Sequence, residues 1–153
     1  MADEPERKLV FLFDENMPQR LANALRGLGE NAFHVYDPEI NLGSAPDEIV
    51  LEHAGRRGWF LIGKDNRILH RPHERAVLRK YDMGAFFLKQ SLDTSLCSIT
   101  QAVFRNWAAI KREAASQKPP FLREIRATSI APMRRKHLGR EVDEDRKRRR
   151  HNQ

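Results

Sequence analysis

The chain has 153 residues, of which 40% are hydrophobic and 32% are charged, and its formal net charge is +7 at pH 7. This length suits one domain with a hydrophobic core of its own. A single cysteine, Cys97, excludes an intramolecular disulfide, and no Cys/His group has the paired spacing of a structural zinc site. The charged start, MADEPERK, resembles neither a signal peptide nor a membrane span, so we expect a cytoplasmic protein without a membrane partner.

The positive charge is concentrated at the C-terminus. Of the 28 Lys/Arg and 21 Asp/Glu residues, 9 and 4 fall in residues 134–153, which gives that segment a net charge of +5 and leaves +2 for residues 1–133. We therefore predict a folded domain at 1–133 and a disordered basic tail at 134–153. The tail is expected either to bind phosphate weakly, in a salt-dependent manner, or to act as a solubilising spacer.

The first predicted elements are a strand, a helix and a second strand. The nearly continuous apolar run Lys8–Phe13 is typical of a strand covered on both faces. Pro18 can occupy the first turn of a helix that ends before Gly29. The apolar positions of this helix are Leu21, Ala24, Leu25 and Leu28. Ala32–Tyr36 is predicted as the second strand, and residues 37–45 as a long turn-rich connection.

The middle of the domain repeats this alternation. Pro46–Arg57 is predicted as a helix that ends at Gly58, and Trp59–Gly63 as the third strand. The apolar face of the helix is predicted at Ile49, Val50, His53 and Ala54. Pro72–Tyr81 is predicted as a short helix and Ala85–Leu88 as the fourth strand.

The last elements are a long helix and an edge strand. The helix is predicted from Asp93 or Thr94 to Ala115, and Phe121–Ile130 is predicted as one edge strand. The apolar stripe of the helix is predicted at Leu96, Ile99, Val103, Trp107 and Ile110. Strands that alternate with helices predict an α/β fold, with a mostly parallel sheet covered by helices on both faces.

Acidic residues follow the predicted strands. In open sheets of this kind, ligands bind beyond the carboxyl ends of the strands. Asp14 and Asp65 lie at such ends, and Asp47 begins the helix after the long connection. Carboxylate oxygens are the ligands that Mg²⁺ prefers, and a bound metal can polarise a phosphodiester and activate water. We predict that these three acids are catalytic and hold the metal.

Each of these acids also has a purely structural interpretation. Asp14 or Asn16 could cap the first helix, and Ser44-x-x-Asp47 matches a capping box. Asp65 could be a turn former. Because all three acids are expected at one edge of one sheet, the sequence favours the functional interpretation.

Further candidates come from the following segment. Glu74 could reach the site from its helix, or be an acid favoured by the helix dipole. Arg67, Arg71, Arg75 and Arg79 could grip a phosphate backbone, or form a solvated helix face. We assign substrate binding to Asn16, Lys64, Arg67 and Arg71.

Five short motifs, in this order and spacing, resemble the small PIN-like proteins related to VapC toxins. The resemblance extends from about Val10 to Ile125. The motifs are FLFDENMP at 11–18, APD at 45–47, RGWFLIGKD at 57–65, RPHE at 71–74 and AFFL at 85–88.

The resemblance implies a three-layer α/β/α PIN-like domain and Mg²⁺- or Mn²⁺-dependent cleavage of single-stranded RNA. It also implies a cognate antitoxin protein as a partner, and a homodimer. The acids of the family fall on Asp14, Asp47 and Asp65, with Asn16 and Glu74 as supporting positions. Because no Asp follows shortly after Asp65, we assign the fourth acidic position to Glu74.

Three functions remain open at the level of sequence. The first is a Mg²⁺-dependent ribonuclease that acts as the toxin of a type II toxin–antitoxin pair. The second is a catalytically inactive PIN-like module that binds RNA or a protein through its basic residues. The third is a metal-dependent DNA nuclease, because nothing in the sequence separates recognition of ribose from that of deoxyribose.

Overall fold

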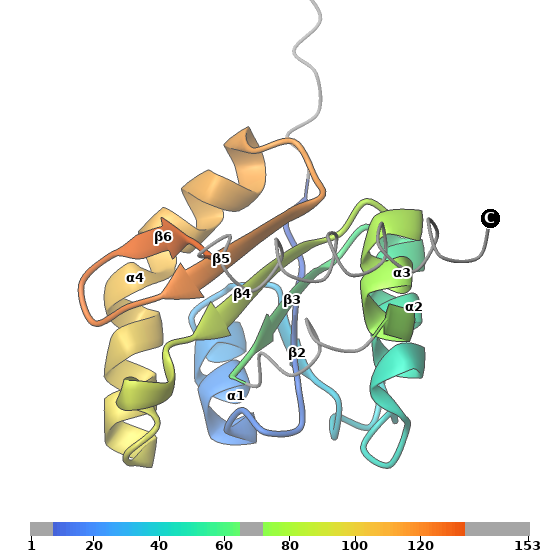
Figure 1. Ribbon diagram of the computed structural model, residues 1–153. Coiled ribbons are helices and arrows are strands. Elements are labelled where there is room, and N and C mark those ends of the chain that lie inside the picture. Colours follow the sequence, from blue (N-terminus) through green and yellow to red (C-terminus); the bar gives the residue numbers. More distant parts are fainter. Residues whose placement is uncertain (1–7, 65–71, 134–153) are drawn as a thin grey trace, which may run out of the picture.

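The computed structural model describes residues 8–64 and 72–133, which form a sheet between two layers of helices (Figure 1). The strand order of this six-stranded sheet is β2-β1-β3-β4-β5-β6. All neighbouring strands are parallel except β5 and β6, which are antiparallel. Helices α1 and α4 pack on one face, and α2 and α3 on the other. The predicted α/β/α architecture with a mostly parallel sheet is therefore confirmed.

The elements lie close to the ranges predicted from the sequence. The strands are β1 (Phe11–Phe13), β2 (Ala32–His34), β3 (Phe60–Gly63), β4 (Gly84–Leu88), β5 (Phe121–Ile125) and β6 (Ile130–Pro132). The helices are α1 (Gln19–Gly27), α2 (Asp47–Arg57), α3 (Pro72–Lys80) and α4 (Leu96–Ser116), with a 3₁₀ turn, η2 (Gln90–Leu92), before α4. None of these helices has the length and apolar composition needed to cross a membrane.

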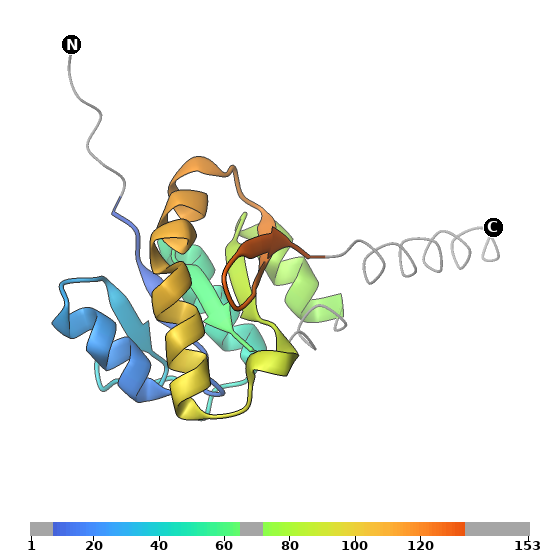
Figure 2. The same cartoon turned by 90° about the vertical axis from the view of Figure 1, so that its left-hand side faces the viewer.

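One core lies between the sheet and the helices α1 and α4, which run side by side over this face (Figure 2). Alternate residues of a strand point to the same face of the sheet, and on this face many of them are phenylalanine, so the core is rich in aromatic rings. Phe11 packs against Trp107 of α4 with ring centroids 4.8 Å apart, and against Phe60 of β3 at 5.5 Å. The interlocked rings fix α4 over the centre of the sheet.

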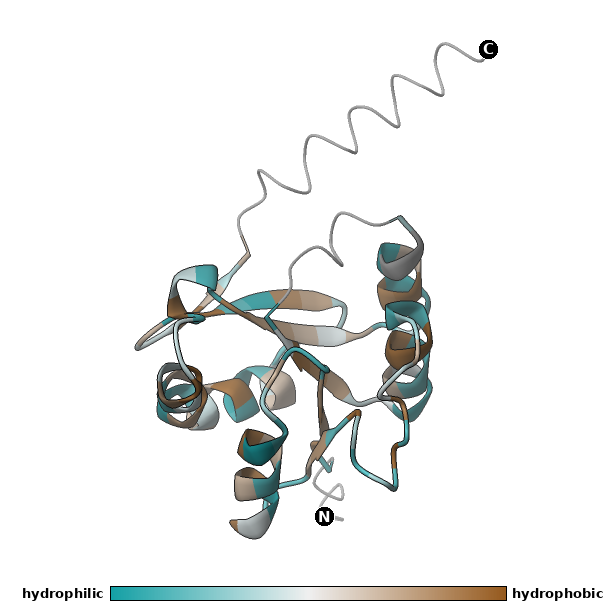
Figure 3. Ribbon diagram, turned by 90° about the horizontal axis from the view of Figure 1, so that it is seen from below, coloured by the Kyte–Doolittle hydropathy of each residue, from teal (hydrophilic) through white to brown (hydrophobic). Residues whose placement is uncertain are grey.

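The second core lies between the opposite face of the sheet and the helices α2 and α3. Leu12, Leu61 and Phe87 point to this side, from β1, β3 and β4. They pack with Leu51 of α2 and Leu78 of α3. The central strands, buried on both faces, are accordingly almost continuously hydrophobic (Figure 3).

The helices bury somewhat different faces from those predicted. Leu28, Ile49 and Leu96 were expected in the core but are exposed, by 70%, 45% and 45% respectively. Leu28 is the C-cap residue of α1 and Leu96 is the first residue of α4, so both lie at helix ends. The 21 residues of α4 span about 31 Å, whereas a five-residue strand spans about 17 Å, so α4 extends past the strands that it covers. In α2 the buried face is rotated, so that Leu51 is buried in place of Ile49.

The prediction of one edge strand over Phe121–Ile130 was wrong. The chain reverses after β5, where the N–H of Arg126 donates to the carbonyl oxygen of Ser129 (2.9 Å). The small and polar residues at 127–129 suit this turn, and the chain returns as β6. Strand β5 is therefore an interior strand, and β6 forms the edge.

A buried carboxylate ties α1 to the end of β2. Asp37 is only 1% exposed. It accepts hydrogen bonds from Arg26 (2.7 Å), from Gln19 (3.0 Å) and from the backbone N–H of His34 (2.8 Å). Burial raises the pKa of Asp37, but the hydrogen bonds from these three donors and the charge of Arg26 outweigh it, so the pKa is lower than usual.

We predict that Asp37→Ala lowers the free energy of unfolding at pH 7 by about 2–4 kcal/mol, because three donors lose their acceptor. The folded-state pKa is depressed, so the stabilisation is present above the ordinary value of 3.8 and is lost as the pH falls through the folded-state value. Urea unfolding between pH 2 and pH 7 measures both effects. Glu39 is an exposed neighbour, so Glu39→Ala is the control. If the free energy of unfolding depended on pH in the same way in both variants, the prediction would be contradicted.

Candidate functional site

The connections from β1 and β3 leave the sheet on opposite faces. Strand β1 is followed by α1 and then by β2 on one side, whereas β3 is followed by α3 and then by β4 on the other side. Helices α1 and α3 belong to different layers. Where connections diverge in this way, a crevice opens beyond the carboxyl ends of the two strands, and ligands bind there. The site is therefore expected at the ends of β1 and β3.

Asp14 lies at this switch point and is only 4% exposed. Its backbone N–H donates to the carbonyl oxygen of Ile62 in β3 (3.0 Å), and its Oδ1 accepts from the N–H of Glu15 (2.7 Å). A Cβ placed on Gly63 would lie 3.7 Å from the Cβ of Asp14. The Asp14 side chain thus stands beside the last residue of β3, as the sequence predicted for an acid at a strand end.

Proline occupies the N-cap position of both α1 and α2. These residues are Pro18 and Pro46, and proline has no side-chain group that could accept a capping hydrogen bond. The alternatives that Asp14 or Asn16 caps α1, and that Ser44 forms a capping box with Asp47, are therefore wrong. Asp47 is the first residue of α2 and is partly exposed.

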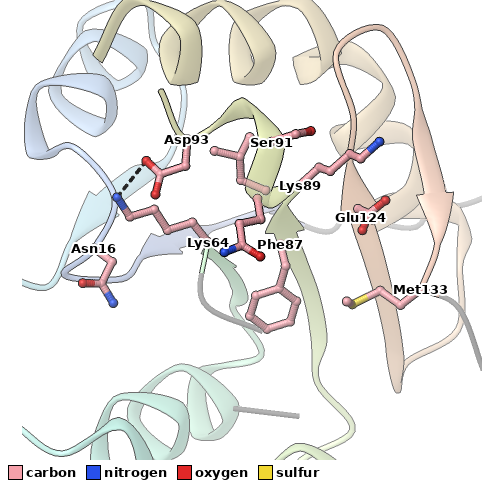
Figure 4. Close-up of a pocket in the computed structure, with 10 residues that line it drawn as sticks. Asn16, Lys64, Phe87, Lys89, Ser91, Asp93, Glu124 and Met133 are labelled. Carbon is pink, nitrogen blue, oxygen red and sulfur yellow. Dashed lines mark hydrogen bonds and ion pairs between the residues drawn. The ribbon is translucent and has the colours of Figure 1, made fainter. Parts of the chain in front are cut away.

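A cavity of about 670 Å³ opens at the carboxyl ends of β3, β4 and β5 (Figure 4). Its lining residues are Asn16, Lys64, Phe87, Leu88, Lys89, Gln90, Ser91, Asp93, Glu124 and Met133. Asn16 comes from the corner between β1 and α1, and Lys64 directly follows β3. The structure thus brings together two of the residues predicted to bind substrate.

The cavity carries two lysine side chains. Lys64 Nζ pairs with Asp93 Oδ1 at 3.1 Å, and both side chains are partly exposed, so the pair is worth about 1 kcal/mol or less. Lys89 lies on the other side of the cavity (Figure 4). Sequence reasoning missed Lys89 and Asp93. Lys89 follows β4 directly, so the same strand-end rule that selected Asp14 would have found it.

His34 holds the corner that carries Asp14. It is buried at the end of β2, where its Nδ1 accepts from the N–H of Tyr36 (3.1 Å). Its Nε2 lies 2.7 Å from the carbonyl oxygen of Met17, so Nε2 carries the proton and donates. The imidazole therefore fastens the corner between β1 and α1 to the end of β2, and His34 is a positioning residue.

Several predicted site residues lie outside the part of the chain that the structure describes. These are Asp65, Arg67 and Arg71, and the side chain of Glu74. Within residues 8–64 and 72–133, no group of three or more His, Cys, Asp or Glu side chains is placed to hold a metal ion. The predicted ligand set includes Asp65 and so extends beyond these residues. Asp14 supplies the hard carboxylate oxygens that suit Mg²⁺ or Mn²⁺.

A protein-family model described as a PIN like domain matches residues 9–90, which is more than half of the chain. The chain belongs to the PIN-like domain family. No curated protein and no solved structure matches it. The match contains β1 to β4, and with them the switch point and Asp14. In this PIN-like domain, α4, β5 and β6 follow the matched region. Strands β5 and β6 extend the sheet beyond β4, and α4 covers part of one face.

We predict that His34→Leu lowers the free energy of unfolding of the PIN-like domain by about 2–4 kcal/mol, because a buried carbonyl and a backbone N–H both lose their partners. His53→Leu is the matched control, because its Nε2 is buried without a hydrogen-bond partner among the described residues. Urea unfolding compares the two variants. A smaller loss for His34→Leu than for His53→Leu would contradict the positioning role.

Proposed function

We propose that this chain is a metal-dependent endoribonuclease that acts as the toxin of a type II toxin–antitoxin pair. The observation that carries the proposal is the place of Asp14: a buried carboxylate at the switch point of a PIN-like domain, two residues before Asn16, which lines a cavity that presents two lysines. Acids and cations at one edge of a sheet suit a phosphodiester substrate, because the acids can hold a metal and the cations can hold phosphates.

Different residues would bind the metal and the substrate in such a reaction. Asp14, with Asp47 and Asp65, would hold Mg²⁺ or Mn²⁺, and Glu74 would supply the fourth acidic position. When bound, the metal lowers the pKa of a water molecule and polarises the phosphodiester. The Lys64 and Lys89 ammonium groups would bind phosphates next to the cleaved bond, and the Asn16 amide would donate to the substrate.

The toxin assignment rests on the resemblance of the five motifs to VapC-type proteins. A toxin of this class is neutralised by a cognate antitoxin protein that is encoded beside it. A small DNA-binding protein in the adjacent reading frame would support the assignment. Co-purification of that protein with this chain, together with relief of growth arrest, would test it directly.

We predict that the full chain cleaves single-stranded RNA with Mg²⁺ or Mn²⁺, that a chelator stops the reaction, and that Asp14→Asn slows it by about 100-fold or more. Asn keeps an oxygen that can accept from the Glu15 N–H, so the fold should be retained. Asp82→Asn makes the same chemical change in the turn before β4, at the opposite edge of the sheet, and should leave the rate unchanged.

Other outcomes of this experiment separate the remaining functions. Unchanged cleavage by Asp14→Asn would reject the proposed catalytic site. RNA binding that survives both Asp14→Asn and chelation, without any cleavage, would favour the inactive binding module. Preferential cleavage of single-stranded DNA of the same sequence would favour the DNA nuclease.

We predict that Lys64→Ala raises KM more than it lowers kcat, because Lys64 contributes phosphate affinity and not a reacting group. The slope of log affinity against log salt should fall by about 0.7, the value for one phosphate contact on a single strand. Lys111→Ala is the control, since Lys111 also belongs to an ion pair, with Glu30 (2.9 Å), but lies on α4 outside the cavity lining. Equal salt slopes for the two variants would contradict the role of Lys64.

A further inference from the structure

We propose that Tyr36 and the small cavity beside it form a subsite that stacks one nucleobase of a single-stranded RNA. The proposal rests on the proposed ribonuclease function and adds a second binding position at the same edge of the sheet. It assigns base binding to the end of β2, away from the lysines that border β3 and β4.

Tyr36 lies at the edge of the sheet that carries Asp14. In the parallel register of β1 and β2, Phe13 is opposite His34, so Asp14 and Tyr36 lie one and two residues beyond that pair. The His34 side chain bonds both the backbone of Tyr36 and that of Met17, at the end of the corner that begins with Asp14. A strand of RNA that runs along this edge would therefore meet both positions.

The Tyr36 ring is exposed, yet held in one orientation. It stacks on the His34 imidazole with ring centroids 5.4 Å apart and an angle of 16° between the planes. Along one edge it packs against Gly43, where an added Cβ would overlap the Cδ1 and Cε1 atoms of the ring. Despite these contacts, Tyr36 remains 53% exposed. An aromatic ring fixed in this way has little rotamer freedom left to lose when a base stacks on it.

The cavity next to the ring has a size and lining that suit a base. Its volume is about 280 Å³, near the lower end of the range of small-molecule sites. The lining residues are Val35, Tyr36, Asn41, Gly43, Ser44 and Ala45. The Asn41 amide and the Ser44 hydroxyl offer donors and acceptors for the edge of a base, and none of the described residues that line the cavity is charged. Stacking on an aromatic ring together with such polar contacts is how unpaired bases are bound.

Binding of a short single-stranded RNA by the full chain tests the subsite, with Ca²⁺ in place of Mg²⁺ to suppress cleavage. Tyr36→Ala should weaken binding about 5- to 150-fold, the range that one base stacked on an aromatic ring contributes. Tyr36→Phe keeps the ring and should bind within about threefold of the wild type. Phe104→Ala removes a different exposed aromatic residue, on α4, and should bind as the wild type does.

A second measurement needs no variant. An RNA that carries 5-iodouridine, irradiated in the complex, should crosslink to the peptide that contains Tyr36, as identified by mass spectrometry. A crosslink confined to other peptides, or wild-type affinity in Tyr36→Ala, would overturn the subsite.

The two proposals fail in different ways. If RNA binds through Tyr36 but is not cleaved with Mg²⁺ or Mn²⁺, the subsite stands and the ribonuclease proposal fails. If cleavage depends on Asp14 while Tyr36→Ala keeps the wild-type KM and affinity, the ribonuclease proposal stands and the subsite is overturned.

Discussion

The parallel pairing of β1 with β3 is the constraint on which the rest of the structure depends. Parallel neighbours cannot be joined by a tight turn, so each connection crosses a face of the sheet and carries a helix with it. With helices on both faces, the central strands have apolar side chains on both sides, and polar residues can appear only where the strands end. Asp14 and Lys64 are those first polar residues, and the connections that diverge behind them leave the edge open. The location of the candidate site is thus a consequence of the topology.

The same rule explains which parts of the fold could be predicted from the sequence. Short apolar runs indicated β1, β3 and β4, because such runs reflect burial on both faces of a sheet. Exposure at a helix end could not be predicted, because it depends on how far the helix extends beyond the short strands; Leu96, at the start of α4, shows this. The Asp37 network was also missed, since an aspartate in a turn has the same local pattern whether it is solvated or buried beneath an arginine.

The candidate site could be predicted to a similar extent. Asn16 and Lys64 were assigned to substrate binding, each within two residues of an acid at the end of a predicted strand, and both line the large cavity. His34 and Tyr36 were not selected, because their roles depend on a ring stack and on the close approach of Gly43, which are contacts between segments and leave no periodic signal. Residues that supply a chemical group at a strand end can be read from a sequence more easily than residues that orient their neighbours.

The two outer strands of the sheet, β2 and β6, are, together with β1, its shortest strands. Strands β2 and β6 have three residues each, and the chain meets a proline at Pro38 soon after β2 and at Pro132 within β6. Rows of backbone groups this short are poor templates for the addition of a further strand from another molecule, and proline removes a donor from the row. Within the part of the chain that the structure describes, a protein partner would therefore find helix faces and loops more accessible for recognition than the rims of the sheet.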